Sequence, residues 1–309
     1  MEAKHKRRRP RGHVSADGLG LVTPAGVRLL SDLVERSGMA RDLSAAVAPW
    51  QPPARRHATG EVVADVAVTL ADGGDCRSAL DGRRAHPECF GAVASLPMAW
   101  RHVAGIDAAR LAAVQTARAA ARAWAWQQGA APARVTLAFD ATLVTAHREK
   151  EQAAPTYTRG FGFPPLLVTC DETDEALTGQ LRPRNAGANT AADHLVLLDA
   201  ALAQLPRPTR AQDPPAGLDV LVRADSVGAT HGFVDAIGAH GLEFAIGFDI
   251  TETVREAILA LPNRAWGEAM QQDRPPREGA WVAEITDRLD RHWTWAAAFH
   301  RLHALPLAA

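Results

Sequence analysis

The sequence predicts an α/β protein in which a helical region precedes a mixed β-sheet flanked by helices. Residues 14–130 carry apolar side chains at helical spacing, whereas residues 133–250 alternate short apolar runs with amphipathic segments. A chain of 309 residues is long enough for one large domain or two modest ones. The formal net charge of -1 and the 47% share of apolar residues are typical of a globular body.

Three segments of the first region are expected to be helices: residues 23–38, 60–74 and 107–129. Thr23 is the expected N-cap of the first helix, with a proline at the next position, and Asp107 is expected to cap the third. The first and third patterns each stop at a glycine. Between the first two helices, the proline-rich stretch "WQPPARRHATG" predicts a break.

Five strands are expected in the second region: residues 134–140, 164–170, 177–182, the apolar run within 214–226, and 242–249. Helices are expected over residues 189–206 and 229–241, which gives the order β-β-β-α-β-α-β. Three strands in a meander followed by alternating helix and strand are the arrangement of a ribonuclease-H-like domain. After it we expect a helix, a loop and a strand, over residues 251–262, 267–279 and 280–289 respectively.

We expect four parts in the chain. They are a basic disordered tail (1–13), a helical region (14–130), a ribonuclease-H-like core (131–250), and a last part with an atypical tail (251–309). The family resemblance given below implies that the second part binds DNA and that the fourth is the start of an insertion region.

The N-terminal tail is strongly basic, with six Lys or Arg residues between Lys4 and Arg11. Such a tract binds polyanions by releasing their counterions, so Arg7, Arg8 and Arg9 are candidate DNA contacts. The alternative is a solvated tail without a partner.

Three cysteines, Cys76, Cys89 and Cys170, are odd in number and widely spread. This favours reduced thiols over a disulfide framework. The apolar runs are too short to span a membrane, and the N-terminus is too basic to be a secretory signal. We therefore expect a cytoplasmic protein with no membrane partner.

Two acids stand at the ends of expected strands: Asp140 ends the first and Asp225 ends the fourth. In a ribonuclease-H-like sheet these strands are neighbours, so the two carboxylates would lie side by side and repel unless a cation compensates them. Mg²⁺ prefers oxygen ligands, and a pair of such ions can clamp a phosphodiester during in-line displacement. Either acid alone is more typical of a turn or a helix cap, so the inference depends on the pair.

Three long strings carry a resemblance to a known family: "FDATLVTAHREKEQAAPTYTRGFGFPPLLV", "LRPRNAGANTAADHLVLLDAALAQLP" and "VLVRADSVGATHGFVDAI". Together they resemble the bacterial DDE transposases of the insertion-sequence 1380 family, from about Ser15 to Asp290. The resemblance implies that Asp140 in "DATLV" and Asp225 in "RADS" are the first two metal-binding acids, with Mg²⁺ or Mn²⁺ as cofactor.

It also implies cleavage and joining of double-stranded DNA at element ends without a covalent protein intermediate. The implied partners are terminal inverted repeats, target DNA and a second copy of the chain. The implied location is the bacterial cytoplasm, on the nucleoid when DNA is bound.

The family's third acid, a glutamate, follows a β-rich insertion beyond the fifth strand. Residues 291–309 contain no acid and do not look like the family, so we expect a truncated chain that lacks this ligand. Glu252 and Glu256, which follow the fifth expected strand, are weak substitutes because helix-surface glutamates are common.

Polar residues near the two acids are further candidates for binding DNA by phosphate contacts or base stacking. Those beside Asp140 are His147, Arg148, Lys150, Tyr157 and Arg159. Arg223 and His231 flank Asp225, and Asn185 and Asn189 precede an expected helix N-terminus, where a phosphate could dock. For each, the alternative is a solvated loop, a cap or a packing role.

Several other functions compete with strand cleavage. The first is a catalytically inactive fragment that only binds DNA or interferes with an intact copy. The second is a haloacid-dehalogenase-like phosphatase built on Asp140 and Thr142, but a β-meander follows the acid where a helix is required.

A serine hydrolase and a zinc site are weaker alternatives. The hydrolase would use Ser226, His231 and Asp225, which lie too close in sequence and lack the nucleophile elbow. The zinc site would use Cys76, His86 and Cys89, and it lacks a fourth ligand.

Overall fold

The computed structural model describes residues 26–50, 57–142, 144–146, 153–155, 161–182, 191–206, 218–270, 275–285, 288 and 302–304. The chain divides into two compact units. The first holds Met1–Ala131 with Leu202–Asp213, and the second holds Pro132–Ala201 with Pro214–Ala309. In the described ranges, no helix combines the length and the apolar character needed to cross a membrane.

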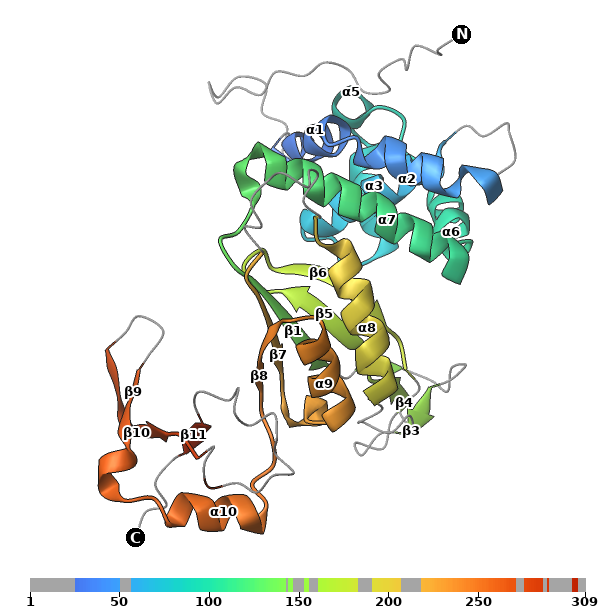
Figure 1. The fold of residues 1–309 in the computed structure, drawn as a ribbon. Coiled ribbons are helices and arrows are strands. Elements are labelled where there is room, and N and C mark those ends of the chain that lie inside the picture. The colour runs from blue at the N-terminus through green and yellow to red at the C-terminus, as the bar shows by residue number, and fades with distance from the viewer. Residues whose placement is uncertain are drawn as a thin grey trace. The chain divides into compact units, whose positions relative to one another are not determined.

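The first unit is built from helices (Figure 1). Its α-helices are α1 (Arg28–Arg36), α2 (Met39–Val47), α3 (Thr59–Ala71), α4 (Leu80–Arg84), α5 (Pro87–Phe90), α6 (Leu96–Ala104) and α7 (Ala108–Ala125). Helix α2 packs against both α3 and α7. The predicted helices of this region are confirmed as α1, α3 and α7, and Asp107 caps α7 by accepting a hydrogen bond from the Arg110 N–H at 3.0 Å.

Helices α2, α4, α5 and α6 were not predicted individually; each spans nine residues or fewer, as does α1, but the α1 pattern is also marked by the Thr23-Pro24 start signal and by Gly38. Helices this short show too few turns for a clear apolar period. Gly38 separates α1 from α2 in the left-handed conformation, with φ of 73°, which explains why the first helical pattern stops there. The predicted N-cap Thr23 lies outside the described residues.

Gly60 allows α2 and α3 to approach closely. A Cβ atom at this position would lie 2.2 Å from the carbonyl oxygen of Ala40 and 2.4 Å from the amide nitrogen of Ser44. Both of these are backbone atoms of α2, so no side-chain rotation can relieve the overlap.

We expect Gly60→Ala to lower the free energy of unfolding by about 1–3 kcal/mol, because the added methyl group overpacks the helix contact. Glycine-to-alanine changes inside a helix otherwise stabilise by up to about 1 kcal/mol. Gly82→Ala in α4 is the matched control, since a Cβ there meets no atom within 4 Å. Urea unfolding of both variants tests this, and equal stability would contradict the expected overlap.

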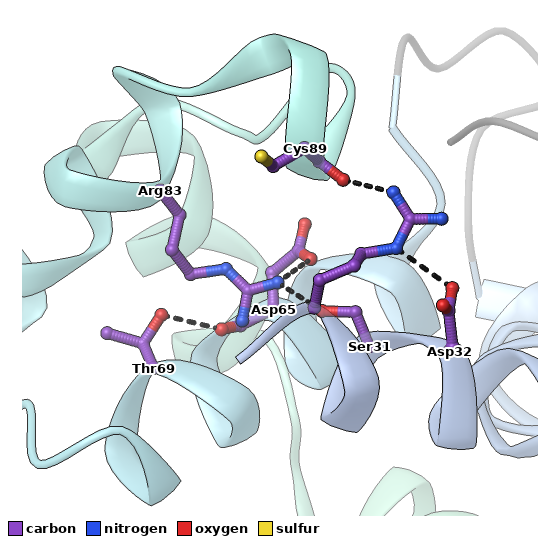
Figure 2. Close-up of polar contacts among 7 residues, drawn as sticks. Ser31, Asp32, Asp65, Thr69, Arg83 and Cys89 are labelled. Carbon is purple, nitrogen blue, oxygen red and sulfur yellow. Dashed lines mark hydrogen bonds and ion pairs between the residues drawn. The ribbon is translucent and has the colours of Figure 1, made fainter. Parts of the chain in front are cut away.

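A buried polar cluster lies in the core of the first unit (Figure 2). The Arg83 side chain is 3% exposed, and its Nη2 lies 3.5 Å from Oδ1 of Asp65, whose side chain is 1% exposed. The same nitrogen donates to the Ser31 Oγ at 2.8 Å, and the guanidinium lies 4.4 Å from the centre of the Phe90 ring. This cluster therefore ties α4 to α1, α3 and α5.

The second unit holds a five-stranded sheet, flanked by α8 (Ala191–Gln204) and α9 (His231–Ala239). The strands are β1 (Val135–Ala141), β5 (Leu166–Cys170), β6 (Glu175–Gln180), β7 (Val220–Ala224) and β8 (Glu243–Ile246). Their order is β6-β5-β1-β7-β8 (Figure 1). The β6–β5 and β5–β1 pairs are antiparallel, and the β1–β7 and β7–β8 pairs are parallel. Strand order and directions are those of a ribonuclease-H-like domain, which confirms the predicted fold class.

Helices α8 and α9 cover one face of this sheet (Figure 1). On that face Leu137 is 0% and Phe139 4% exposed. The Phe139 ring lies 6.0 Å from the ring of His194 on α8 and 5.0 Å from the ring of Phe233 on α9. Because successive residues of a strand alternate between faces, Asp140 points to the opposite face from Phe139.

A second, small sheet extends the β1–β5 pair beyond Asp140. It consists of β2 (Val144–Ala146), β3 (Ala154–Pro155) and β4 (Phe161–Phe163), in the order β2-β4-β3. Ala141 pairs with Leu166, and three residues further along both strands Val144 pairs with Phe163, so the register is unchanged. The ladder is interrupted where Pro164 and Pro165 follow β4, since proline has no N–H to donate.

This small sheet was not predicted, since no strand was expected between residues 140 and 164. The expected loop over residues 267–279 is also wrong, since it contains β9 (Gly267–Met270) and the start of β10 (Pro276–Ala283). These strands and β11 (Leu302–Ala304) form a third sheet in the order β11-β10-β9. The helix predicted just before them is confirmed as α10 (Glu252–Leu259).

Candidate functional site

The structure brings Asp140 and Asp225 to the same edge of the main sheet. Parallel pairing matches Phe139 of β1 with Ala224 of β7, so Asp140 and Asp225 occupy the next position on each strand. Neighbouring strands lie about 4.8 Å apart, and residues in register on parallel strands share a face. Both acids are exposed. The strand β1 runs one residue past Asp140, and Asp225 directly follows β7, close to the predicted positions.

The backbone around Asp225 is held by a tight turn. The Gly228 N–H donates to the Asp225 carbonyl at 3.1 Å, and the Gly247 N–H donates to the Ala224 carbonyl at 3.0 Å. A Cβ on Gly228 would lie 2.7 Å from the Cβ of Ala224, so the turn packs closely onto the end of its own strand. The carboxylate of Asp225 therefore projects from a rigid strand end and turn.

Arg223 shares the face of the two acids, two residues before Asp225. Its Nη2 lies 2.7 Å from Oδ2 of Asp171, and the two side chains are 56% and 30% exposed. The predicted DNA contact is thus half of an exposed ion pair. Asp171, which directly follows β5, was not among the predicted site residues.

The donor set of the acid pair suits a hard divalent cation. Two carboxylates on one face of adjacent strands supply the oxygen ligands that Mg²⁺ and Mn²⁺ prefer, and their exposure leaves room for water or phosphate. Among the residues the structure describes, however, no group of three or more His, Cys, Asp or Glu side chains is placed to hold a metal ion.

Neither candidate third acid joins the pair within the described residues. The Glu252 carboxylate on α10 accepts two hydrogen bonds from Arg255, at 2.9 and 2.6 Å. These hydrogen bonds, opposed by burial, lower the pKa of Glu252. Glu256 lies on the same helix and is exposed.

Glu172 makes a separate contact at the opposite end of β1. It accepts hydrogen bonds from the backbone N–H and the hydroxyl of Thr136, both at 2.7 Å. Burial raises the pKa of the Glu172 carboxyl, but the Thr136 hydrogen bonds outweigh it, and the pKa lies below its ordinary value of 4.5. Burial also raises the pKa of the neighbouring Cys170 thiol, which keeps the thiol protonated.

The lowered pKa of Glu172 predicts an acid-dependent contribution to stability. A carboxyl whose folded pKa lies below its unfolded value stabilises the fold above pH 4.5, and this contribution is lost as pH falls through the folded pKa. Because the carboxylate is exposed, we expect less than about 1 kcal/mol. Urea unfolding from neutral pH to below pH 4.5 should show a shallower acid decline for Glu172→Gln than for Glu256→Gln. Identical declines would contradict the assignment.

Many of the predicted DNA contacts lie outside the described residues. These are Arg7, Arg8, Arg9, His147, Arg148, Lys150, Tyr157, Arg159, Asn185 and Asn189. The described strands β2, β3 and β4 flank the segments with His147, Lys150 and Tyr157, and they continue the β1–β5 ribbon past Asp140. His231 is the exposed first residue of α9.

The residues of the alternative zinc site make other contacts. Cys76 lies 2.9 Å from the Ser78 hydroxyl, and His86 lies 3.0 Å from Glu88.

Two buried residues behind the acid edge were missed. Arg182, which is 3% exposed, donates from Nε to the Pro164 carbonyl at 3.2 Å, and its Nη1 lies 3.4 Å from Oδ2 of Asp193. His194 is 2% exposed, and its ring lies 6.0 Å from the ring of Phe139 and 5.0 Å from the ring of Phe233. The apolar pattern of α8 predicts that His194 is on its inner face, but no local signal indicates its ring partners.

The sequence matches the family model "Transposase DDE domain group 1" over residues 4–299. This match includes the basic tail from residue 4, and it reaches into the segment 291–309 that was expected to be unlike the family. A search of curated proteins found no match.

Two solved structures are similar to the chain at low identity. One is "Mos1 transposase paired-end complex with left transposon end", at 12% identity and a TM-score of 0.26, over 63% of this chain and 60% of that chain. The other is "Cryo-EM structure of piggyBac transposase synaptic complex with hairpin DNA (SNHP)", at 11% identity and a TM-score of 0.31, over 85% of this chain and 58% of that chain. The chain thus spans about three-fifths of the length of each.

Proposed function

Since the chain belongs to the transposase DDE domain group 1 family, we propose that it cleaves and joins DNA strands at the ends of a mobile element, with Mg²⁺ or Mn²⁺ held by Asp140 and Asp225. DDE transposases use divalent metals for this chemistry. The observation that carries the proposal is the register of β1 and β7, which aligns the two acids on one face of the sheet edge.

In this proposal the two acids bind the divalent cation and fix its position at the sheet edge. Asp140 and Asp225 supply carboxylate oxygens from two hydrogen-bonded strands, so the spacing of the ligands is fixed before DNA arrives. A bound divalent cation supplies charge stabilisation for the oxygens of the phosphodiester. The buried packing of Phe139 on the other face keeps β1 from rotating, and the exposure of both acids leaves the edge open to a DNA strand.

DNA binding is assigned to residues around this edge and to the basic tail. Arg7, Arg8 and Arg9 would contact phosphates without reading sequence. His147 and Lys150 would contact the strand near the scissile phosphate, and Tyr157 would stack a base. These three follow strands that extend past Asp140, which supports their assignment.

Arg223 completes this set. Its ion pair with Asp171 is exposed, so exchange of the carboxylate for a DNA phosphate costs little.

The finer identity is also part of the proposal. We assign the chain to the bacterial insertion-sequence 1380 family on the "DATLV" and "RADS" motifs. It would act as a homodimer on terminal inverted repeats and target DNA, and it would be found on the nucleoid when bound.

A second function is favoured by the surroundings of the acid pair. No third acid joins Asp140 and Asp225 within the described residues, and Glu252 is held by Arg255. A protein with this set would bind element ends without cutting them and would interfere with an intact transposase. This alternative shares DNA binding with the first function and differs from it only in lacking strand cleavage.

Strand cleavage and DNA binding, measured side by side, separate the two functions. The full chain is incubated with duplex DNA carrying terminal inverted repeats, with Mg²⁺, with Mn²⁺ and with EDTA. Metal-dependent nicks at the repeat ends support the transposase, and binding without nicks supports the interfering protein. An absence of both would overturn the proposal.

A further inference from the structure

The face of the main sheet that carries the two acids also carries an ion pair that spans β1. Arg223 lies opposite Ala138 in the parallel β1–β7 ladder, so it enters this face from one side of β1. Asp171 follows β5 on the other side, and its backbone N–H donates to the Thr136 carbonyl at 3.1 Å. The Arg223 Nη2 lies 2.7 Å from the Asp171 Oδ2. The Arg223 side chain therefore reaches across a whole strand to its carboxylate.

This contact draws the guanidinium away from the acid edge. A strand rises about 3.3 Å per residue, so the level of Thr136, where Asp171 lies, is about 13 Å from the level of Asp140 along β1. Arg223 starts halfway between these levels, opposite Ala138, and its side chain is directed to the Thr136 end. Directed the other way, the same side chain would lie beside the phosphate of a DNA strand bound at the acid edge.

The charges on this face favour the retracted position, in which the guanidinium contacts Asp171, as long as DNA is absent. Asp171 and Glu172 place two carboxylates beside Thr136. A divalent cation held by the two acids would repel the guanidinium from the other end of the strand. A DNA phosphate at the acid edge supplies a negative charge that competes with Asp171. The position of the Arg223 side chain thus depends on whether a phosphate is bound.

The ion pair is exposed enough to open. The side chains of Arg223 and Asp171 are 56% and 30% exposed, so water can hydrate both groups when they separate. Exposed ion pairs are weak because water and salt compete with them. The contact can therefore restrain Arg223 without preventing its release.

We infer that Asp171 is an autoinhibitory residue, which holds Arg223 in the retracted position and competes with DNA phosphate for its guanidinium. The inference rests on the proposed function, in which Arg223 contacts DNA at the acid edge. It adds a residue that lowers DNA affinity without touching DNA or metal. Removal of the Asp171 charge should therefore tighten DNA binding, and this gain should require Arg223.

A double-mutant cycle on the full chain tests this competition. Binding of fluorescein-labelled, mixed-sequence duplex DNA is followed by fluorescence anisotropy in Mg²⁺ for the wild type, Asp171→Asn, Arg223→Gln and the double variant. We expect Asp171→Asn to lower the Kd about threefold, the fold-change that matches the loss of an exposed ion pair. Arg223→Gln should raise the Kd about three- to tenfold, because it removes a charged phosphate contact. The double variant should bind like Arg223→Gln.

Asp174→Asn is the matched control for the simple loss of a negative charge. Asp174 lies in the same turn between β5 and β6, is exposed, and takes part in no ion pair within the residues that the structure describes. Its φ of 51° is tolerated by asparagine. This variant should change the Kd by less than about 1.5-fold, because salt screens an exposed charge that has no partner to release. Far-UV circular dichroism confirms that each variant is folded.

The outcomes separate the inference from the proposed function. A gain in affinity for Asp171→Asn no larger than that for Asp174→Asn would overturn the inference, and so would the same gain in the Arg223→Gln background. Weaker binding by Asp171→Asn would show that Asp171 orients Arg223 towards DNA, which also contradicts it. Unchanged affinity in Arg223→Gln would remove Arg223 from the DNA contacts and overturn the inference, while the acid pair would stand. If the wild type does not bind duplex DNA, the proposed function itself fails, and the inference falls with it.

Discussion

Replacing Asp140 by asparagine is expected to lower Mg²⁺-dependent strand cleavage at element ends by about a thousandfold or more. Under the proposed function, the change removes one of the two proposed carboxylate ligands, and metal stabilisation of the reacting phosphate is worth several kcal/mol. Asp225→Asn should cause a similar loss. The double variant should be little worse than either single one, because ligands of one metal centre act as a unit.

The same substitutions should leave the fold intact, which makes the loss specific. Two carboxylates in register repel each other when no cation is bound, so removing one charge should maintain or raise the melting temperature in EDTA. Asp235→Asn, at an exposed position of α9, is the matched control and should cleave like the wild type. Retention of metal-dependent cleavage in Asp140→Asn would exclude this acid from the centre.

The second large effect is expected on stability, at the buried Arg83–Asp65 pair of the first unit. Asp65→Ala should lower the free energy of unfolding by about 3–5 kcal/mol, because it leaves the guanidinium of Arg83 in the core without its carboxylate. Arg83→Met should cost a comparable amount, since it removes the buried guanidinium that faces the Asp65 carboxylate. Urea unfolding followed by circular dichroism measures both.

Burial is the reason for this magnitude, and a neighbouring pair provides the control. Arg84 and Asp81 lie 2.7 Å apart on α4, but their side chains are 43% and 50% exposed. Arg84→Ala should therefore cost less than about 1 kcal/mol, although its ion pair is the shorter of the two. Replacing both buried partners, as Asp65→Leu with Arg83→Met, should recover most of the loss. Equal costs for Arg83 and Arg84 would contradict the argument from burial.

The main sheet could be predicted from the sequence because its strands are apolar runs bounded by polar residues. The strand order followed from the succession of elements, and the order placed Asp140 beside Asp225. The small sheet could not be predicted in this way. Its strands have two or three residues, too few to show alternation, and one of them contains Pro155.

The β9–β10 hairpin was missed for a related reason. Its strands are mostly exposed, and Pro276 begins β10, so this stretch has the composition of a loop.

At the candidate site, Asp140 and Asp225 could be predicted because each stands at the end of an apolar strand. Arg182, His194 and Glu172 could not be predicted, because their contacts join segments that are distant in the sequence. Periodicity identifies a buried face of a helix but not the side chains that will meet it.

The unchanged register on either side of Pro164 and Pro165 has a consequence for how the chain assembles. A slip of one residue between β1 and β5 would turn the Asp140 carboxylate towards α8 and bury it. Such a slip would also misalign Val144 with Phe163, since both ladders belong to one ribbon. A chain with the slipped register would therefore lose the native hydrogen bonds of both the β1–β5 and the β2–β4 ladder. The ladder between β2 and β4 beyond the prolines thus favours the register of β1 and β5 in which Asp140 faces outward.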